Sequence, residues 1–466
     1  MFFLVSLKPY FCTLQIKTQY MTVFLIKAAQ LFLSLSILVV LHELGHFIPA
    51  KLFKTKVEKF YLFFDIKFSL FKKKIGETVY GIGWLPLGGY VKIAGMIDES
   101  MDKEQMAKPP QPWEFRSKTT WQRLIIMLGG VFMNFVLAFF LFMVILGVWG
   151  TKYITKDDVK FGYGITKTLE NYGFQQGDKI VSVDGKPLGE LTEDINKLLM
   201  FRTIENIKVE HLNGAVEDIA LPEDIGKQLF EAGDLPGLEP RSPFQLDSVL
   251  AKSPAEKAGL KAKDKIVAID GKPVTYFTDF VYGLKNSTSE NIVLQIERNN
   301  VKQDLTLIPD EDKKIGIVTT KTDPDFVTYN IRNYTLSESI TGGLSHGYWE
   351  IKDYLAQFKY IFTKKGASQI GGFAAIGKMF PAKWNWQAFW YLTAFLSIML
   401  GVLNLLPIPA LDGGHVAFLL YEMVSGRKPG DKFLEYAQII GFVFLIGLVL
   451  FANGNDAVKA IQEWLN

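Results

Sequence analysis

Cysteine is almost absent from this chain, because Cys12 is the single example among 466 residues. A disulfide framework and a thiolate zinc site both need more than one cysteine, so the sequence excludes both. Histidine is scarce too, with five residues. Any metal ion must therefore be held by histidines and carboxylates.

Charged residues are also few, at 21% of the chain, and they nearly cancel to a net charge of +3. A nucleic-acid partner is therefore not expected. Hydrophobic residues make up 49% and include 37 Phe, which is rich for a soluble protein. The length allows two to four domains.

Four stretches reach the roughly 20 mostly apolar residues that a membrane-spanning helix needs. They are about Met21–Ala50, Leu124–Trp149, Trp384–Leu411 and Tyr436–Asn455. No small-residue cleavage site of a signal peptide precedes residue 42. We expect Met21 to be the true start, with residues 1–20 an upstream extension without function.

The pentapeptide His42-Glu43-Leu44-Gly45-His46 follows residues 28–41, which carry no charge. On a helix, an HExxH motif places two imidazoles one turn apart on one face, with the glutamate beside them as a candidate base. Ionisable groups at membrane depth are costly and are taken as functional by default. The alternative is a chance match whose histidines only form hydrogen bonds, and the scarcity of histidine disfavours it.

Positive charge predicts the orientation of the spans. The loop after the first span contains eight lysines, and the loop between the third and fourth spans contains three basic residues. These are Lys51, Lys54, Lys56, Lys59, Lys67, Lys72, Lys73, Lys74, Arg427, Lys428 and Lys432. By the positive-inside rule both loops are cytoplasmic, and both termini and residues 150–383 face outward.

This topology brings polar residues from three spans to one face of the membrane. His42 and His46 lie at the inner end of the first span, Asn134 lies in the inner half of the second, and Asp412 closes the third. Asp412 is therefore the candidate third metal ligand. The alternatives are a solvated Asp412 at an ordinary helix end, and His415 as the ligand in its place.

Three motifs together resemble the site-2 protease family of intramembrane zinc metalloproteases. They are HELGH at 42–46, GGVFMN at 129–134, and NLLPIPALDGG at 404–414, which contains Asn404, Pro407, Pro409 and Gly413. Val131 departs from the pattern, because many relatives have Pro there. The segment Tyr80–Ile93 is similar to the family's membrane-associated β-loop. The match covers residues 21–466 and is nearest the bacterial type that cleaves anti-sigma factors.

The resemblance implies a zinc ion held by His42, His46 and Asp412, with Glu43 as the general base. It also implies that the substrate helix is held extended by an open strand edge at the β-loop. Asn134 would bind a freed carbonyl or amide of the substrate, or would alternatively join two helices of the protein. The expected substrate-binding residues are thus Asn134, Tyr80, Gly81, Ile82 and Gly83.

The outward-facing segment contains a repeat. The stretch Gly177–Pro187 recurs as Lys263–Pro273, 86 residues further along. A repeat of this length indicates one duplicated domain. Ser253–Leu260, SPAEKAGL, resembles the entry turn and short helix of bacterial PDZ domains. Such domains capture a peptide as an added strand, or act only as a steric plug, and neither copy has a clear carboxylate-binding loop.

The predicted fold is a polytopic α-helical membrane protein with four spans and two inserted PDZ-like α+β domains. The expected parts are the extension 1–20, spans one and two in 21–154 with the β-loop at about 75–95, PDZ-like domains at 155–238 and 239–312, a connecting region at 313–383, and spans three and four in 384–466. The aromatic-rich stretch 340–364 is expected on the outer membrane surface or packed against the PDZ pair.

The predicted function is zinc-dependent cleavage of single-span membrane proteins, such as anti-sigma factors, within the bilayer and after another protease has trimmed their outer domain. The predicted location is the bacterial inner membrane, with the active site towards the cytoplasm and the PDZ pair in the periplasm. Two other classes compete with this prediction. A silent scaffold would not need three converging zinc ligands, and a zinc transporter should show inverted repeats of its spans.

Overall fold

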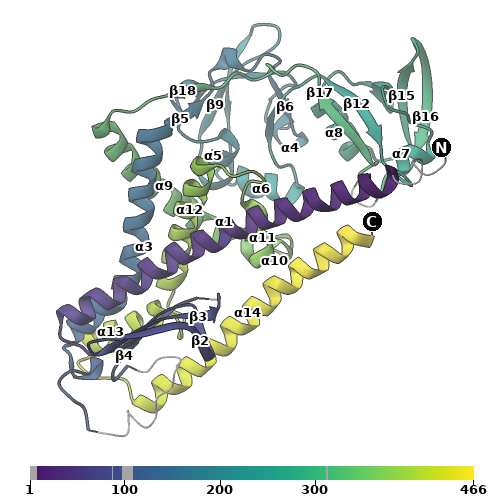
Figure 1. Ribbon diagram of the computed structural model, residues 1–466. Coiled ribbons are helices and arrows are strands. Elements are labelled where there is room, and N and C mark those ends of the chain that lie inside the picture. The colour runs from purple at the N-terminus through teal and green to yellow at the C-terminus, as the bar shows by residue number, and fades with distance from the viewer. Residues whose placement is uncertain (1–7, 87, 97–108, 311–312, 466) are drawn as a thin grey trace. The chain divides into compact units, whose positions relative to one another are not determined.

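The computed structural model describes residues 8–86, 88–96, 109–310 and 313–465, which form two compact units (Figure 1). The first unit combines the chain up to Trp149 with the chain from Asn333 onward. The second unit is the inserted segment Gly150–Arg332.

Four helices of the first unit are long and apolar enough to cross a membrane, which confirms the four predicted spans. They are α1 (Lys8–Leu52), α3 (Thr120–Trp149), α12 (Trp386–Leu405) and α14 (Asp431–Leu465), and the apolar part of α1 is Met21–Leu52. The other α-helices that the structure describes in this unit are α9 (Leu336–Ile361), α10 (Lys364–Gln369), α11 (Phe373–Met379) and α13 (Asp412–Ser425).

The third span is shorter than predicted. It ends at Leu405, because Pro407 and Pro409 follow at once and a proline can neither donate to nor fit within a continuing helix. A short loop then leads to α13, whose first residue is Asp412. Asp412 therefore begins a new helix and does not close the third span, which corrects the sequence-based expectation.

Helices α1 and α3 meet at two glycines. A side-chain carbon on Gly45 would collide with the backbone carbonyl of Gly129, and one on Gly129 would collide with the carbonyl of Gly45. Small residues at such a crossing allow two membrane helices to approach to backbone contact. This crossing lies within the HExxH motif of α1, so it determines how closely α3 approaches the motif.

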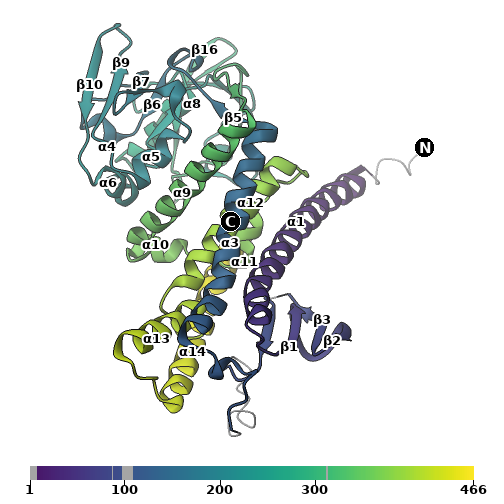
Figure 2. The ribbon, with the colours of Figure 1, turned by 90° about the vertical axis from the view of Figure 1, so that its left-hand side faces the viewer.

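Helix α9 packs along α3 and α12, as Figures 1 and 2 both show. Gly343 and Gly347 face α3 so closely that a side-chain carbon on them would overlap Met143 and Phe139. The ring of Tyr354 lies 6.1 Å from that of Phe395 on α12. The aromatic-rich stretch therefore packs on α3 and α12 within the helical unit, and its expected position on the outer membrane surface or against the PDZ pair stays a prediction.

A four-stranded sheet follows α1 after a short turn, in the order β2-β3-β1-β4. Its strands are β1 (Val57–Leu62), β2 (Phe64–Ile75), β3 (Thr78–Leu85) and β4 (Tyr90–Ile93). β3 runs parallel to β1 and antiparallel to β2, and β4 is antiparallel to β1. The predicted β-loop at about 75–95 is thus part of a larger sheet that begins at Val57.

The second unit contains the same four-stranded sheet twice, in the orders β10-β9-β7-β8 and β16-β15-β13-β14. The first sheet consists of β7 (Lys179–Val183), β8 (Lys186–Pro187), β9 (Asn206–Glu210) and β10 (Val216–Ala220), and the second of β13 (Lys265–Ile269), β14 (Lys272–Pro273), β15 (Ile292–Arg298) and β16 (Val301–Leu307). Each copy has its own apolar core. The sequence repeat is therefore a repeat of structure.

Short elements complete the second unit. The helices are α4 (Lys167–Glu170), α5 (Ile195–Phe201) and α6 (Ile225–Ala232) in the first copy, and α7 (Pro254–Lys257) and α8 (Phe277–Asn286) in the second. Three strand pairs are β6 (Tyr163–Ile165) with β11 (Leu238–Pro240), β12 (Phe244–Val249) with β17 (Ile317–Lys321), and β5 (Thr151–Tyr153) with β18 (Asn330–Arg332). The last pair holds the two ends of the unit side by side.

Candidate active site

Three side chains from two helices meet in the interior of the helical unit. His42 and His46 lie one turn apart on α1, and Asp412 is the first residue of α13. The Nε2 atoms of the two histidines are 3.3 Å apart, and each is 3.3 Å from Oδ2 of Asp412. The ligand atoms of these three residues therefore form a triangle with equal sides.

This triangle fits a tetrahedral zinc ion. Zinc binds imidazole nitrogen and carboxylate oxygen at about 2.0–2.1 Å, which places neighbouring ligands of a tetrahedron about 3.3 Å apart. Oδ2 of Asp412 is buried and, apart from the two imidazole nitrogens, has no hydrogen-bond donor among the described residues. A buried carboxylate oxygen facing two imidazole nitrogens is suited to a cation. Three protein ligands also leave a fourth position open, as catalytic zinc sites do.

A contact with the backbone of α3 orients the ring of His46. Its Nδ1 atom lies 2.8 Å from the backbone carbonyl oxygen of Ile126 on α3. Because a carbonyl only accepts, Nδ1 must carry the proton and donate, and the lone pair of His46 is then on Nε2. An outer hydrogen bond of this kind orients a metal-binding imidazole and makes it a stronger ligand.

Asn134 orients the ring of His42 in a similar way. The Asn134 side chain is fully buried, and its amide nitrogen is placed 3.1 Å from Nδ1 of His42, while its Oδ1 has no partner among the described residues. Exchanging the two amide atoms lets Oδ1 accept a hydrogen bond from Nδ1–H and leaves Nε2 of His42 for the metal. Of the two roles expected for Asn134, this contact is of the helix-joining kind, with a candidate ligand as its partner.

Gly130 and Asn404 also lie close to the two histidine rings. A side-chain carbon on Gly130 would collide with the Nε2 atom of His46 and would come within 2.7 Å of His42, so glycine makes the room that both rings occupy. The side-chain nitrogen of Asn404, near the end of α12, lies 3.4 Å from Nε2 of His42. α12 thus also reaches the site.

The loop between α12 and α13 is tightly folded beneath Asp412. Side-chain carbons on Gly413 and Gly414 would collide with the carbonyl of Leu406 and approach that of Ile408, which explains the two glycines after the aspartate. Ala410 adopts a left-handed conformation with φ of 80°, and strained backbone of this sort is common at functional sites. Its N–H donates to Gln438 of α14 over 3.2 Å.

The candidate base lies against the sheet. Glu43 is 8% exposed, and its carboxylate lies close to the backbone N–H of Val91 of β4. Just before β4, a side-chain carbon on Gly89 would overlap Val39 of α1 and approach Glu43. Glycine at this point lets the edge strand β4 pass directly beside the base.

The predicted open strand edge within Tyr80–Ile93 does not lie at the expected substrate-binding residues 80–83. Tyr80, Gly81 and Ile82 pair with β1 on one side and with β2 on the other, and Gly83 pairs with β2. β3 is therefore an interior strand, and its backbone pairs with β1 on one side and β2 on the other. The edge strand of this segment is β4, Tyr90–Ile93.

His415 does not belong to the ligand cluster. Among the described residues, the group whose ligand atoms lie close enough to hold one metal ion consists of His42, His46 and Asp412. His415 lies one turn further along α13 and lines a pocket with Arg123 and Glu422. The preference for Asp412 over His415 agrees with this arrangement.

Comparison with known proteins gives the family. The model of peptidase family M50 matches residues 30–448. The chain belongs to peptidase family M50. It is a membrane-embedded zinc metalloendopeptidase of the site-2 type, and its cofactor is Zn²⁺.

Curated relatives match this M50 peptidase over nearly its whole length. A protein of Clostridium acetobutylicum named as a zinc metalloprotease is 30% identical over 92% of this chain and 97% of its own. The regulator of sigma-E protease RseP of Escherichia coli is 29% identical over 93% and 98%. The regulator of sigma E protease of Haemophilus influenzae is 27% identical over 94% and 99%.

Sequence reasoning missed three parts of this site. The carbonyl of Ile126 and the N–H of Val91 are backbone groups, which every residue has, so no residue type marks them. Gly130 did carry a signal, because two adjacent glycines in an apolar helix indicate a close approach, but its neighbours became clear only from the structure.

Proposed function

We propose that the chain hydrolyses peptide bonds within the membrane-spanning segment of single-span membrane proteins, using zinc held by His42, His46 and Asp412. The observation that carries this proposal is the triangle of ligand atoms with 3.3 Å sides. It is formed at the end of a helix that is apolar enough to cross the bilayer. Metal chemistry placed there acts on substrates that are themselves in the membrane.

In the proposed mechanism, Glu43 transfers a proton from the attacking water to the leaving nitrogen. When bound, zinc supplies a Lewis acid that lowers the pKa of a water molecule towards about 7. The Glu43 carboxylate accepts a proton from the water as its oxygen bonds to the scissile carbonyl carbon. Glu43 then returns this proton to the leaving nitrogen as the carbon–nitrogen bond breaks, giving a carboxylic acid and an amine. The backbone N–H of Val91 lies beside the carboxylate of Glu43.

A substrate helix must be unwound before it can be cut, because its amides are hydrogen-bonded within the helix. We assign the holding of the unwound segment to the edge strand β4, which lies at the rim of the sheet and passes beside Glu43. An extended peptide can add to such an edge as a further strand. Asn404, which lies 3.4 Å from His42, is within reach of the same segment.

The proposed substrates are anti-sigma factors or similar single-span proteins that another protease has already trimmed. Support comes from the relatives named as regulators of sigma E, which match over almost the full chain. The lysine-rich loop after α1 supports an orientation with the zinc site towards the cytoplasm. We therefore propose a bacterial inner membrane location with the inserted unit in the periplasm.

We propose that the inserted unit is a pair of PDZ-like domains, at about 155–238 and 239–312, that acts as a steric filter. In the first copy, β6 pairs with β11 on one side. On its other side it forms backbone hydrogen bonds with residues 177 and 178. In the second copy, β12 pairs with β17 and accepts a bond from Lys263. A peptide can be added as a strand only where the backbone N–H and C=O groups of an edge strand have no partner within the protein. The contacts of β6 and β12 therefore favour a steric filter over peptide capture.

The test is cleavage of a single-span model substrate with a short outer tail by the purified full chain in liposomes. Wild type, Glu43→Gln and zinc-stripped protein are compared, with the bound zinc measured in each. We expect cleavage within the span by wild type and after zinc is restored. Glu43→Gln should retain zinc and lose cleavage.

Two results would contradict the proposal. Cleavage by a Glu43→Gln variant that still holds zinc would show that Glu43 is not the base. Stoichiometric zinc without cleavage of any of several such substrates would instead support a non-catalytic scaffold.

A further inference from the structure

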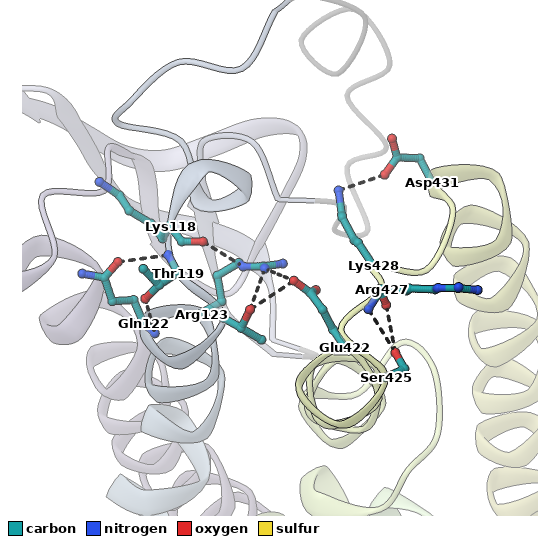
Figure 3. Close-up of polar contacts among 10 residues, drawn as sticks. Lys118, Thr119, Gln122, Arg123, Glu422, Ser425, Arg427, Lys428 and Asp431 are labelled. Atoms are coloured by element: carbon teal, nitrogen blue, oxygen red, sulfur yellow. Dashed lines mark hydrogen bonds and ion pairs between the residues drawn. The ribbon is translucent and has the colours of Figure 1, made fainter.

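A buried ion pair joins the first turn of α3 to the last part of α13. Nη2 of Arg123 donates to Oε1 of Glu422 over 2.6 Å, and the two side chains are 9% and 16% exposed. Figure 3 shows the guanidinium and the carboxylate directed at each other across the gap between the helices. Both helices belong to the helical unit, and neither residue touches the zinc ligands.

The pair is held by a set of directional bonds. The hydroxyl of Thr120 donates to the same Glu422 oxygen over 3.1 Å. Nε of Arg123 donates to the carbonyl of Lys118 over 3.2 Å (Figure 3). The guanidinium is therefore fixed to its own segment as well as to α13. Glu422 thus accepts two hydrogen bonds from the first turn of α3.

Each partner is connected through its helix to one part of the zinc site. Glu422 lies ten residues after Asp412 on the same helix, which is about 15 Å along its axis. Arg123 lies one turn before Ile126, whose carbonyl orients His46. The pair thus joins the helix that supplies the third ligand to the helix that orients the second.

Apolar side chains also meet along this seam. Val416 and Leu419 of α13 pack with Leu124, Ile126 and Met127 of α3 in one cluster. Apolar packing is not directional, so it opposes a slip of one helix along the other less specifically than hydrogen bonds do. A slip of one turn would move Asp412 by about 5.4 Å, which exceeds the whole width of the ligand triangle.

We propose that Arg123 and Glu422 are positioning residues that set the register of α13 on α3 and so place Asp412 at bonding distance from the zinc ion. A buried ion pair often adds no more stability than an apolar pair of the same size, whereas it can specify one arrangement among several. The proposal rests on the proposed zinc site at His42, His46 and Asp412. It assigns the pair a role in zinc affinity that apolar side chains cannot replace.

The test compares variants of the full chain in detergent by competitive zinc titration with a chelator and by the visible spectrum of the cobalt-substituted protein. Arg123→Met/Glu422→Leu removes both charges and keeps the volume, so the fold is preserved. We expect its zinc affinity to fall about 10- to 100-fold, as is usual when support around metal ligands is lost, with an altered cobalt spectrum. Cleavage should lose kcat with KM nearly unchanged.

Arg116→Gln provides the matched control. Arg116 donates to Glu114 over 2.6 Å with side chains that are 11% and 4% exposed, so distance and burial match the pair under test. Both partners lie on one short segment, however, so the bond between them does not link α3 to α13. Arg116→Gln should leave zinc affinity and the cobalt spectrum unchanged.

Charge reversal supplies the second variant set. Arg123→Glu and Glu422→Arg each place like charges together, whereas the double exchange restores an opposite pair. The proposal requires the double variant to bind zinc more tightly than either single one. Wild-type zinc affinity and cobalt spectrum in Arg123→Met/Glu422→Leu would overturn it, while a wild type that binds no zinc through His42, His46 and Asp412 would overturn the proposed function instead.

Discussion

Nδ1 of His46 on α1 lies 2.8 Å from the carbonyl oxygen of Ile126 on α3. A helix carbonyl is available to a side chain of another helix only when the two backbones run close together. The contact of Gly45 with Gly129 brings them that close. The orientation of one candidate ligand is therefore a consequence of how two membrane helices pack, and substitutions in α3 that touch no metal should alter zinc binding.

Gly130→Ala is the sharpest substitution of that kind. The new methyl group would overlap His46 and press against His42, so the imidazoles must move out of the triangle. We expect zinc affinity to fall by about 10- to 100-fold, measured by chelator competition. Gly447→Ala is the control, because a methyl group there meets nothing within 4 Å. Equal affinity in the two variants would show that the histidines do not depend on the space at residue 130.

Asn134 is predicted to act on zinc affinity and not on substrate affinity. Asn134→Leu removes the partner of His42 Nδ1, and we expect about a 10- to 100-fold weaker zinc site. Asn134→Asp keeps an acceptor oxygen and should lose much less. A raised KM with unchanged zinc affinity in both variants would contradict this and would support a direct contact of Asn134 with the substrate.

Much of the helical unit could be predicted from the sequence. Apolar runs of span length are a strong local signal, and the four spans are confirmed. The motif spacing also indicated which residues meet, because His42 and His46 share a helix face on the first span and Asp412 follows the third span at the same predicted depth. Charge in the loops supplied this depth, which is a rule of the bilayer and not of local structure.

Strand order and helix partners could not be predicted in the same way. The sequence of residues 80–83 shows a strand, but whether a strand lies at an edge or inside a sheet depends on which other strands pair with it. The amphipathic pattern of α9 shows that one face is covered and does not show by what. The small residues Gly343 and Gly347 were the available signal that α9 contacts another helix closely.

The first copy of the inserted unit should weaken as pH rises. Nδ1 of His211 lies 2.7 Å from Asp178 and Nε2 lies 3.0 Å from Glu217, and these hydrogen bonds, Asp178 first, raise the pKa of His211. A raised pKa in the folded state means that the stabilisation is complete below the unfolded value of about 6.5 and is lost as pH rises through the folded value.

The second copy provides the control for this effect. There Arg298 binds Asp264, the counterpart of Asp178, through two hydrogen bonds, and arginine does not titrate in this range. Hydrogen exchange corrected for intrinsic rates should show protection of β9 and β10 falling with pH relative to β15 and β16. His211→Arg should remove the difference. If the ratio of hydrogen-exchange protection between the two copies stays constant with pH in the wild type, the prediction is contradicted.

Excision of the inserted unit should abolish selection against untrimmed substrates. β5 and β18 hold the two ends of the unit side by side, and a side-chain carbon on Gly150 would collide with the carbonyl of Arg332. Joining Trp149 to Asn333 therefore removes a complete unit and leaves the helices that bear the site. Two model substrates with one common span, one with a short outer tail and one with a folded outer domain, provide the measurement.

The wild type should cut the short-tailed substrate at least about tenfold faster, a difference of about 1.4 kcal/mol in the barrier. The excised chain should cut both at similar rates, and adding Glu43→Gln should stop both, since the same site is used. An unchanged preference after excision would show that selection lies in the helical unit. Loss of cleavage of the short-tailed substrate, with zinc affinity retained, would show instead that the inserted unit captures the substrate tail, because a filter is not needed once the tail is short.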